Sequence, residues 1–92
     1  MKPLPISEIV DAINQEMVDG GSAALRAAAK NVEGAVIAEL KRDRLYVQIW
    51  QRFLDDRDRY EPLLVGALTV LARDDAFIRR VEPLLAAYRA AW

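Results

Sequence analysis

Apolar residues recur along most of the chain at the three- and four-residue spacing of an amphipathic helix. Near the N-terminus this spacing predicts a helix over about residues 7–18. The apolar face of that helix consists of Ile6, Ile9, Val10, Ile13 and Met17. Ser7 is suited to cap its start, and Gly20 and Gly21 are suited to end it, because glycine readily adopts the left-handed conformation that closes many helices. Ser22 can then cap the following helix.

The same periodicity continues over residues 23–54 with little interruption. Its apolar positions are Leu25, Ala28, Ala29, Val32, Val36, Leu40, Val47, Trp50 and Leu54. One straight helix of about 30 residues would be about 45 Å long, which is wider than most domains of this size. We therefore expect a break. The candidates are residues 31–34, where Gly34 weakens a helix, and the charged run 41–44, which we favour.

Residues 55–59 contain only aspartate and arginine, and we expect them to form the main surface loop. Pro62 is well placed as the first residue of the next helix, because its missing N–H costs nothing there. That helix, residues 63–72, is apolar nearly all round. It is therefore expected to lie centrally with neighbours on several sides, and Gly66 would let one of them come close.

A last helix is expected to begin after Asp74 or Asp75, either of which can act as its N-cap. Its apolar positions are Phe77, Val81, Leu84, Leu85, Tyr88 and Trp92. Pro83 should kink this helix or restart it after Val81, because proline removes a helical hydrogen bond.

No segment alternates with period two, and no internal repeat is found. The sequence thus predicts an all-α fold, a compact bundle of five to six short helices. Residues 1–92 are expected to form a single helical domain with residues 1–6 as a short N-terminal arm. The chain is 53% hydrophobic and 29% charged, with four Gly and four Pro, which favours a packed globule over a disordered chain.

The residue types leave little for catalysis. The chain has no His and no Cys, and its only serines, Ser7 and Ser22, stand where helix caps belong. A hydrolytic triad is excluded because its imidazole is missing. We therefore expect no enzymatic activity and no cofactor.

The absence of cysteine also fits a reducing cytosol, and the N-terminal MKPLPISEIV lacks the apolar core of a signal peptide, so a cytoplasmic location is expected.

The acidic side chains after residue 54 do not fit the pattern of a calcium-binding loop. In the calcium-loop register that begins at Asp56, position six is Glu61 instead of glycine and position twelve is Ala67 instead of glutamate. Arginines interleave the acids and partly neutralise them. We therefore expect no metal site.

Charge and composition also bear on nucleic acid and membrane as partners. Thirteen basic and fourteen acidic residues give a net charge of −1, which argues against a polyanion as the obligatory partner. The basic residues between 41 and 59 are interspersed with aspartates, which favours a mixed-charge solvated face. The Ala- and Gly-rich stretch 21–40 carries regular charges, so close helix packing explains it better than membrane contact.

The most distinctive surface candidate lies at residues 42–54, where the apolar arc is wider than one buried stripe requires. Trp, Tyr and Arg are the residues that most often anchor protein interfaces. We therefore predict a partner-binding face, and its members are Arg42, Tyr46, Ile49, Trp50 and Arg52. The alternative is that the whole arc is intramolecular core.

From about Trp50 onward, the chain resembles the small helical effector-associated accessory domains of bacterial signalling and conflict systems. The similarity lies in a segment of the type ALxxLAxDPxFxxxLxxLL, matched by residues 67–85 with Asp75 where the proline would stand. The resemblance covers about half of the chain. It implies a use like that of death-fold adaptors, which couple a sensor or NTPase to an effector through helical contacts.

The resulting expectation is a non-enzymatic protein–protein interaction module, an adaptor that binds itself or another protein and couples partners in a bacterial signalling or defence system. One alternative is a small phage-type inhibitor that blocks a host defence complex. A second alternative is a helical protein that binds nucleic acid.

Overall fold

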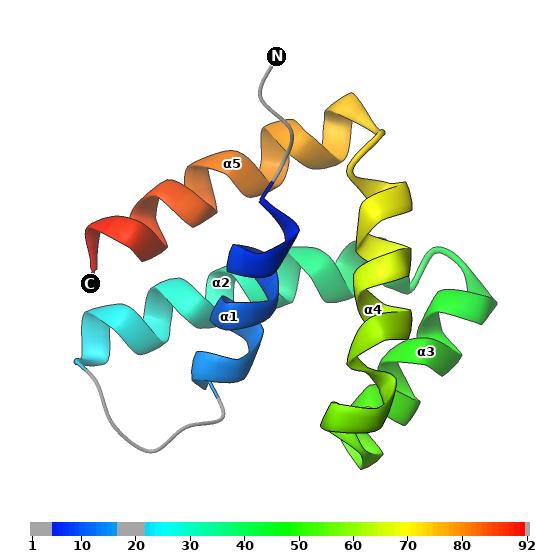
Figure 1. The fold of residues 1–92 in the computed structure, drawn as a ribbon. Coiled ribbons are helices and arrows are strands. Elements are labelled where there is room, and N and C mark those ends of the chain that lie inside the picture. Colours follow the sequence, from blue (N-terminus) through cyan, green and yellow to red (C-terminus); the bar gives the residue numbers. More distant parts are fainter. Residues whose placement is uncertain (1–4, 17–21, 92) are drawn as a thin grey trace.

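The computed structural model describes residues 5–16 and 22–91 (Figure 1). Within these ranges the chain forms five helices and no strand, so the predicted all-α bundle of five to six helices is confirmed. The helices are α1 (Ile6–Glu16), α2 (Ala23–Leu40), α3 (Arg44–Asp55), α4 (Arg57–Leu71) and α5 (Asp75–Ala90).

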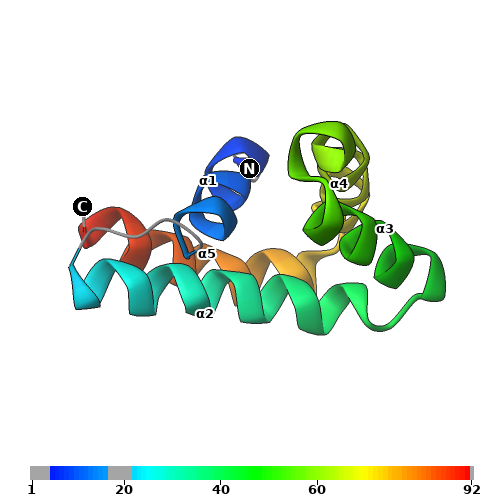
Figure 2. The same cartoon turned by 90° about the horizontal axis from the view of Figure 1, so that it is seen from below.

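The helices are arranged in two layers. The long helices α2 and α5 run side by side in opposite directions, and α1 packs across them (Figure 1). Seen from below, α1 and the α3–α4 hairpin lie on the same side of α2 (Figure 2). The molecule is accordingly flat, with principal extents of 33, 33 and 18 Å.

Helix α1 begins earlier than the sequence pattern indicated. The carbonyl oxygen of Pro5 accepts the N–H groups of Glu8 at 3.1 Å and Ile9 at 3.3 Å. Ser7 therefore lies inside the first turn, with an exposed side chain, and its predicted role as N-cap is wrong. The predicted stop at Gly20 and Gly21 lies outside the described residues.

Helix α2 starts and ends where the preferred interpretation put its boundaries. The Ser22 hydroxyl oxygen accepts the Leu25 N–H at 3.1 Å, so Ser22 is confirmed as the N-cap. The helix passes through Gly34 without interruption, and the break falls at residues 41–43. Asp43 supplies the reason, because its Oδ1 accepts the Leu45 N–H at 2.9 Å and caps α3.

The predicted surface loop at residues 55–59 is wrong, because only Asp56 separates α3 from α4. The Asp56 Oδ1 accepts the Arg59 N–H at 3.3 Å and starts α4 at Arg57. Pro62 is consequently the sixth residue of α4 instead of the first. It is exposed, and because it has no N–H it cannot donate to the carbonyl oxygen of Asp58, which is also an exposed residue.

Helix α5 is capped by Asp74, whose Oδ1 accepts the Ala76 N–H at 2.9 Å. It continues through Pro83 to Ala90 as one helix, so the predicted restart after Val81 is wrong. Pro83 is exposed, and the hydrogen bond it cannot make would have involved the solvent-facing side of the helix. Trp92 lies outside the described residues.

The core lies where α1, α2 and α5 meet and extends under α3 and α4. Its fully buried large side chains are Ile9, Ile13, Val32, Val36, Leu40, Phe53, Leu64, Leu68, Phe77, Val81 and Leu85. Among the described residues, no helix has the length and apolar character needed to cross a membrane.

Helix α4 lies at the edge of the bundle instead of at its centre. It packs chiefly against α3 and to a smaller extent against α1, and its buried residues are Leu64, Ala67 and Leu68. Gly66 is exposed, and a Cβ placed on it would meet no atom within 4 Å. The predicted central position of this helix, and the close approach of a neighbour at Gly66, are therefore both wrong for the single chain.

Candidate functional site

The apolar members of the predicted partner-binding face lie on α3 and point largely toward the core. Trp50 is 9% exposed, and its ring centroid lies 5.7 Å from that of the buried Phe53. Tyr46 and Ile49 are half-buried and pack against the core. The central residue of the predicted face is thus enclosed by its own chain.

The two arginines of the predicted face are exposed and lie beside different groups. Arg42 Nη1 lies 3.3 Å from Glu39 Oε1, at the end of α2. The Arg52 guanidinium lies 6.0 Å from the ring centroid of Tyr60, on α4. The predicted set is therefore divided between two neighbourhoods. It stays a prediction, and its enclosed tryptophan makes it the weaker of two candidate surfaces.

A shallow cleft of about 280 Å³ lies beside Trp50, between the end of α2 and α3. Its lining residues are Ile37, Leu40, Lys41, Val47, Trp50 and Gln51. Ligand sites usually combine apolar walls with several convergent polar groups. This cleft has the walls but only Lys41 and Gln51 as polar groups, so it offers little for chemistry.

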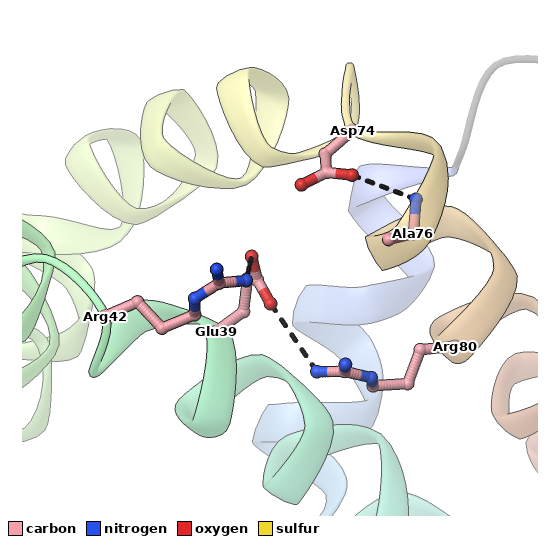
Figure 3. Close-up of polar contacts among 5 residues, drawn as sticks. All are labelled: Glu39, Arg42, Asp74, Ala76 and Arg80. Carbon is pink, nitrogen blue, oxygen red and sulfur yellow. Dashed lines mark hydrogen bonds and ion pairs between the residues drawn. The ribbon is translucent and has the colours of Figure 1, made fainter.

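Glu39 is the one charged residue buried in the described part of the chain, at 6% exposure (Figure 3). Its Oε1 pairs with Arg42 at 3.3 Å and its Oε2 with Arg80 at 3.5 Å. The side chains of the two arginines are 71% and 52% exposed. Both carboxylate oxygens are therefore already paired. The ion pair with Arg80 links the end of α2 to α5, which is a structural role.

A second polar link joins α4 to α1. Arg57 Nη1 donates to Asn14 Oδ1 at 2.9 Å, and the same guanidinium lies 5.0 Å from the ring centroid of Phe53. A third link pairs Arg89 on α5 with Glu8 on α1. These contacts hold the helices together.

The acidic residues around the α3–α4 junction do not converge. In residues 5–16 and 22–91, no group of three or more acidic side chains could hold a metal ion. Asp56 is used as the N-cap of α4.

The second candidate surface is the outer side of α4. We call it the α4 outer face, and it consists of Pro62, Leu63, Val65, Gly66, Thr69 and Val70, all of which are exposed and uncharged. Leu63 is 50% exposed, Val65 36% and Val70 48%. The Thr69 hydroxyl donates to the Val65 carbonyl oxygen at 2.7 Å, so the only polar side chain of the face is already satisfied within the helix.

Each end of the α4 outer face carries an acidic and a basic residue. Before it come Asp58 and Arg59, and after it come Arg73 and Asp74. The Arg59 guanidinium lies 5.5 Å from the Tyr60 ring centroid, and the Asp74 carboxylate caps α5; both side chains are exposed.

Asp58 and Arg73 are exposed, and no other described residue forms a hydrogen bond or ion pair with their side chains.

The sequence indicates this surface, because residues 63–72 are apolar nearly all round. A helix that is apolar all round normally lies against other elements on several sides. Among residues 5–16 and 22–91, the bundle supplies neighbours on one side of α4 only, so the other side is exposed.

Comparison of the chain with protein-family models, with curated proteins and with solved structures gives no match.

Proposed function

We propose that this protein is a non-enzymatic protein–protein interaction module that docks its partner on the α4 outer face. The observation that carries this proposal is the exposure of Leu63, Val65 and Val70 on a helix that has no charged side chain from Pro62 to Ala72. Contiguous apolar surface on a small soluble domain is typical of a contact site.

Free energy favours covering this surface. Removing apolar surface from water stabilises a complex by about 25 cal/mol per Å², before the cost of association is subtracted. The face also lies on a formed helix that is anchored by Leu64 and Leu68, both at 0% exposure. Docking therefore requires little additional ordering, which lowers the entropic cost of binding.

The residue types support a role without catalysis. The chain has no His or Cys to act as base or nucleophile, and its buried carboxylate, Glu39, is paired at both oxygens. The resemblance of residues 67–85 to effector-associated accessory domains supports a finer proposal, an adaptor that couples partners in a bacterial signalling or defence system in the cytoplasm. Those residues include the second half of α4 and thus part of the α4 outer face.

Site-specific photo-crosslinking in the native cell tests this proposal. A photoreactive residue at Val65 should give adducts of protein mass, whereas the same residue at Gln48, an exposed position of α3, should give few. Adding Leu63→Glu should remove the adducts formed at Val65. Equal adducts at both positions, or none at either, would overturn the proposal.

A further inference from the structure

We infer that the α3–α4 hairpin, residues 44–71, opens as a unit while α1, α2 and α5 stay folded. The hinges are residues 41–43 and 72–74, and the latch is the hydrogen bond from Arg57 to Asn14. Opening gives the domain a second state, in which apolar surface that the closed molecule buries is exposed. The hinge does not depend on the docking function proposed above, although the hairpin carries the α4 outer face.

The packing divides the helices into two groups. Helices α3 and α4 contact each other more extensively than either contacts the rest of the chain, whereas α2 packs extensively against both α1 and α5. Figure 1 shows the hairpin at one side of the molecule. Of the eleven large side chains that are fully buried in the described residues, eight lie on α1, α2 and α5 and three on the hairpin. The three helices therefore keep most of the core when the hairpin opens.

The helices of the hairpin are short. Helix α3 has 12 residues and α4 has 15. Isolated helices shorter than about 12–15 residues are marginal in water, because most helical stability in proteins comes from packing. Once the hairpin leaves the bundle, its backbone amides therefore become able to exchange with solvent.

Both connections of the hairpin to the rest of the chain are short turns. Three residues join α2 to α3, and three join α4 to α5. The last residue of each turn, Asp43 or Asp74, has an extended backbone with a ψ of 127° or 116°. Hinged units move by rotation about a few such residues at the ends of helices. The hairpin can therefore leave the bundle without unfolding α2 or α5.

One polar link closes the hairpin onto α1. Among residues 5–16 and 22–91, the bond from Arg57 Nη1 to Asn14 Oδ1 at 2.9 Å is the only side-chain hydrogen bond or ion pair between the hairpin and the other helices. The ring of Phe53, 5.0 Å from the same guanidinium, belongs to the hairpin itself.

This link leaves part of the guanidinium unpaired. Its acceptor is a neutral amide, and Arg57 Nη2 is buried without a hydrogen-bond partner. Burying an unpaired donor destabilises the closed state, because water supplies the missing bond once the hairpin opens. The latch therefore holds the hairpin less firmly than an arginine–carboxylate pair would.

Hydrogen exchange of backbone amides, followed residue by residue by NMR in the full chain, tests the hinge. After correction for intrinsic rates, amides in the middle of α3 and α4 should exchange at least about tenfold faster than those in the middle of α2 and α5, because they require only the partial opening. Equal protection in all four helices would overturn the hinge.

Gly34→Ala distinguishes a separate opening from the unfolding of the whole domain. Gly34 lies on α2, which stays folded when the hairpin opens, and the added Cβ meets no atom within 4 Å. The substitution should slow exchange of the most protected amides of α2 and α5 by about two- to fivefold and leave α3 and α4 unchanged. Ser22→Ala, which removes the N-cap of α2, should speed exchange in α2 and α5 by about fivefold without affecting the hairpin. Equal changes in all four helices would show that the hairpin has no opening of its own.

Asn14→Asp tests the latch. The carboxylate offers Arg57 a negative charge and a second acceptor, so it should stabilise the closed state and slow exchange of the hairpin several-fold. Asn31→Asp is the matched control, because it makes the same change at an exposed position of α2 and should leave exchange of the hairpin unchanged. If the two variants do not differ in exchange of α3 and α4, Arg57 is not the latch.

Discussion

Replacing the buried carboxylate of Glu39 tests whether its ion pairs with Arg42 and Arg80 stabilise the fold. Glu39→Gln keeps the volume of the side chain but removes its charge. The amide oxygen can accept from one arginine, whereas the amide nitrogen cannot accept from the other. One of the two charge-assisted contacts, at 3.3 and 3.5 Å, is therefore lost outright.

The size of the effect follows from burial. Breaking a fully buried ion pair costs roughly 3–5 kcal/mol, and an exposed pair contributes roughly 0.2–1 kcal/mol. Here the acid is buried, but the arginines Arg42 and Arg80 are mostly exposed, so water screens one side of each pair. We expect Glu39→Gln to lower the free energy of unfolding by about 1–2 kcal/mol, which is about 4–16 °C in melting temperature for a domain of this size.

Urea denaturation followed by circular dichroism measures this change. Glu82→Gln, at an exposed position of α5, is the matched control and should change stability by less than about 0.5 kcal/mol. A double-mutant cycle of Glu39→Gln with Arg80→Gln should give a coupling of about 0.5–1 kcal/mol. Glu39→Met should cost less than Glu39→Gln, because an apolar side chain leaves no polar group unpaired. If the coupling is zero, or if Glu39→Gln lowers the free energy of unfolding no more than the control does, the ion pairs of Glu39 do not stabilise the fold.

Three further predictions concern the helices. Ser22→Ala should lower the free energy of unfolding, measured by urea denaturation, by about 1 kcal/mol, because it removes the N-cap of α2. Ser7→Ala, inside α1, should change it little. Equal changes in the two variants would contradict the assigned caps. Asn14→Ala should lower the free energy of unfolding by about 1–2 kcal/mol, because it removes the acceptor of the half-buried Arg57 guanidinium. An unchanged midpoint of urea denaturation would contradict the link between α4 and α1. Gly34→Ala should raise stability by about 0.5–1 kcal/mol, since the added Cβ meets no atom within 4 Å; a lower melting temperature would contradict this packing.

The helix boundaries that could be predicted are those that depend on adjacent residues. Ser22 and Asp74 cap their helices as their residue types suggest, since a cap requires only a side chain that reaches an N–H two or three positions on. The same local rule gave the wrong result at Ser7, where the carbonyl of Pro5 begins the helix instead. At the α3–α4 junction, a run of five charged residues suggested a loop, although one capping aspartate, Asp56, is enough.

The same patterns could not predict how the helices pack against one another. The apolar arc around Trp50 is evident from the sequence, but periodicity cannot decide whether this arc faces the core or a partner. Helix α4 shows the converse, because its nearly all-round apolar character predicts neighbours on several sides. Which sides are filled depends on how α1 and α3 pack, and that depends on residues distant in the sequence.

The one-residue junction at Asp56 also restricts how the protein can evolve. Loops usually tolerate insertions and deletions, but each residue added here would change the phase of α4 by about 100° relative to α3. Such a change would turn Leu63 and Val70 toward α3 and bring other residues to the outside. Except at Asp56, which caps α4, and at Arg57, which donates to Asn14, substitutions among the charged residues of the junction should therefore accumulate in descendants of this gene, while the number of residues between Phe53 and Leu64 stays fixed.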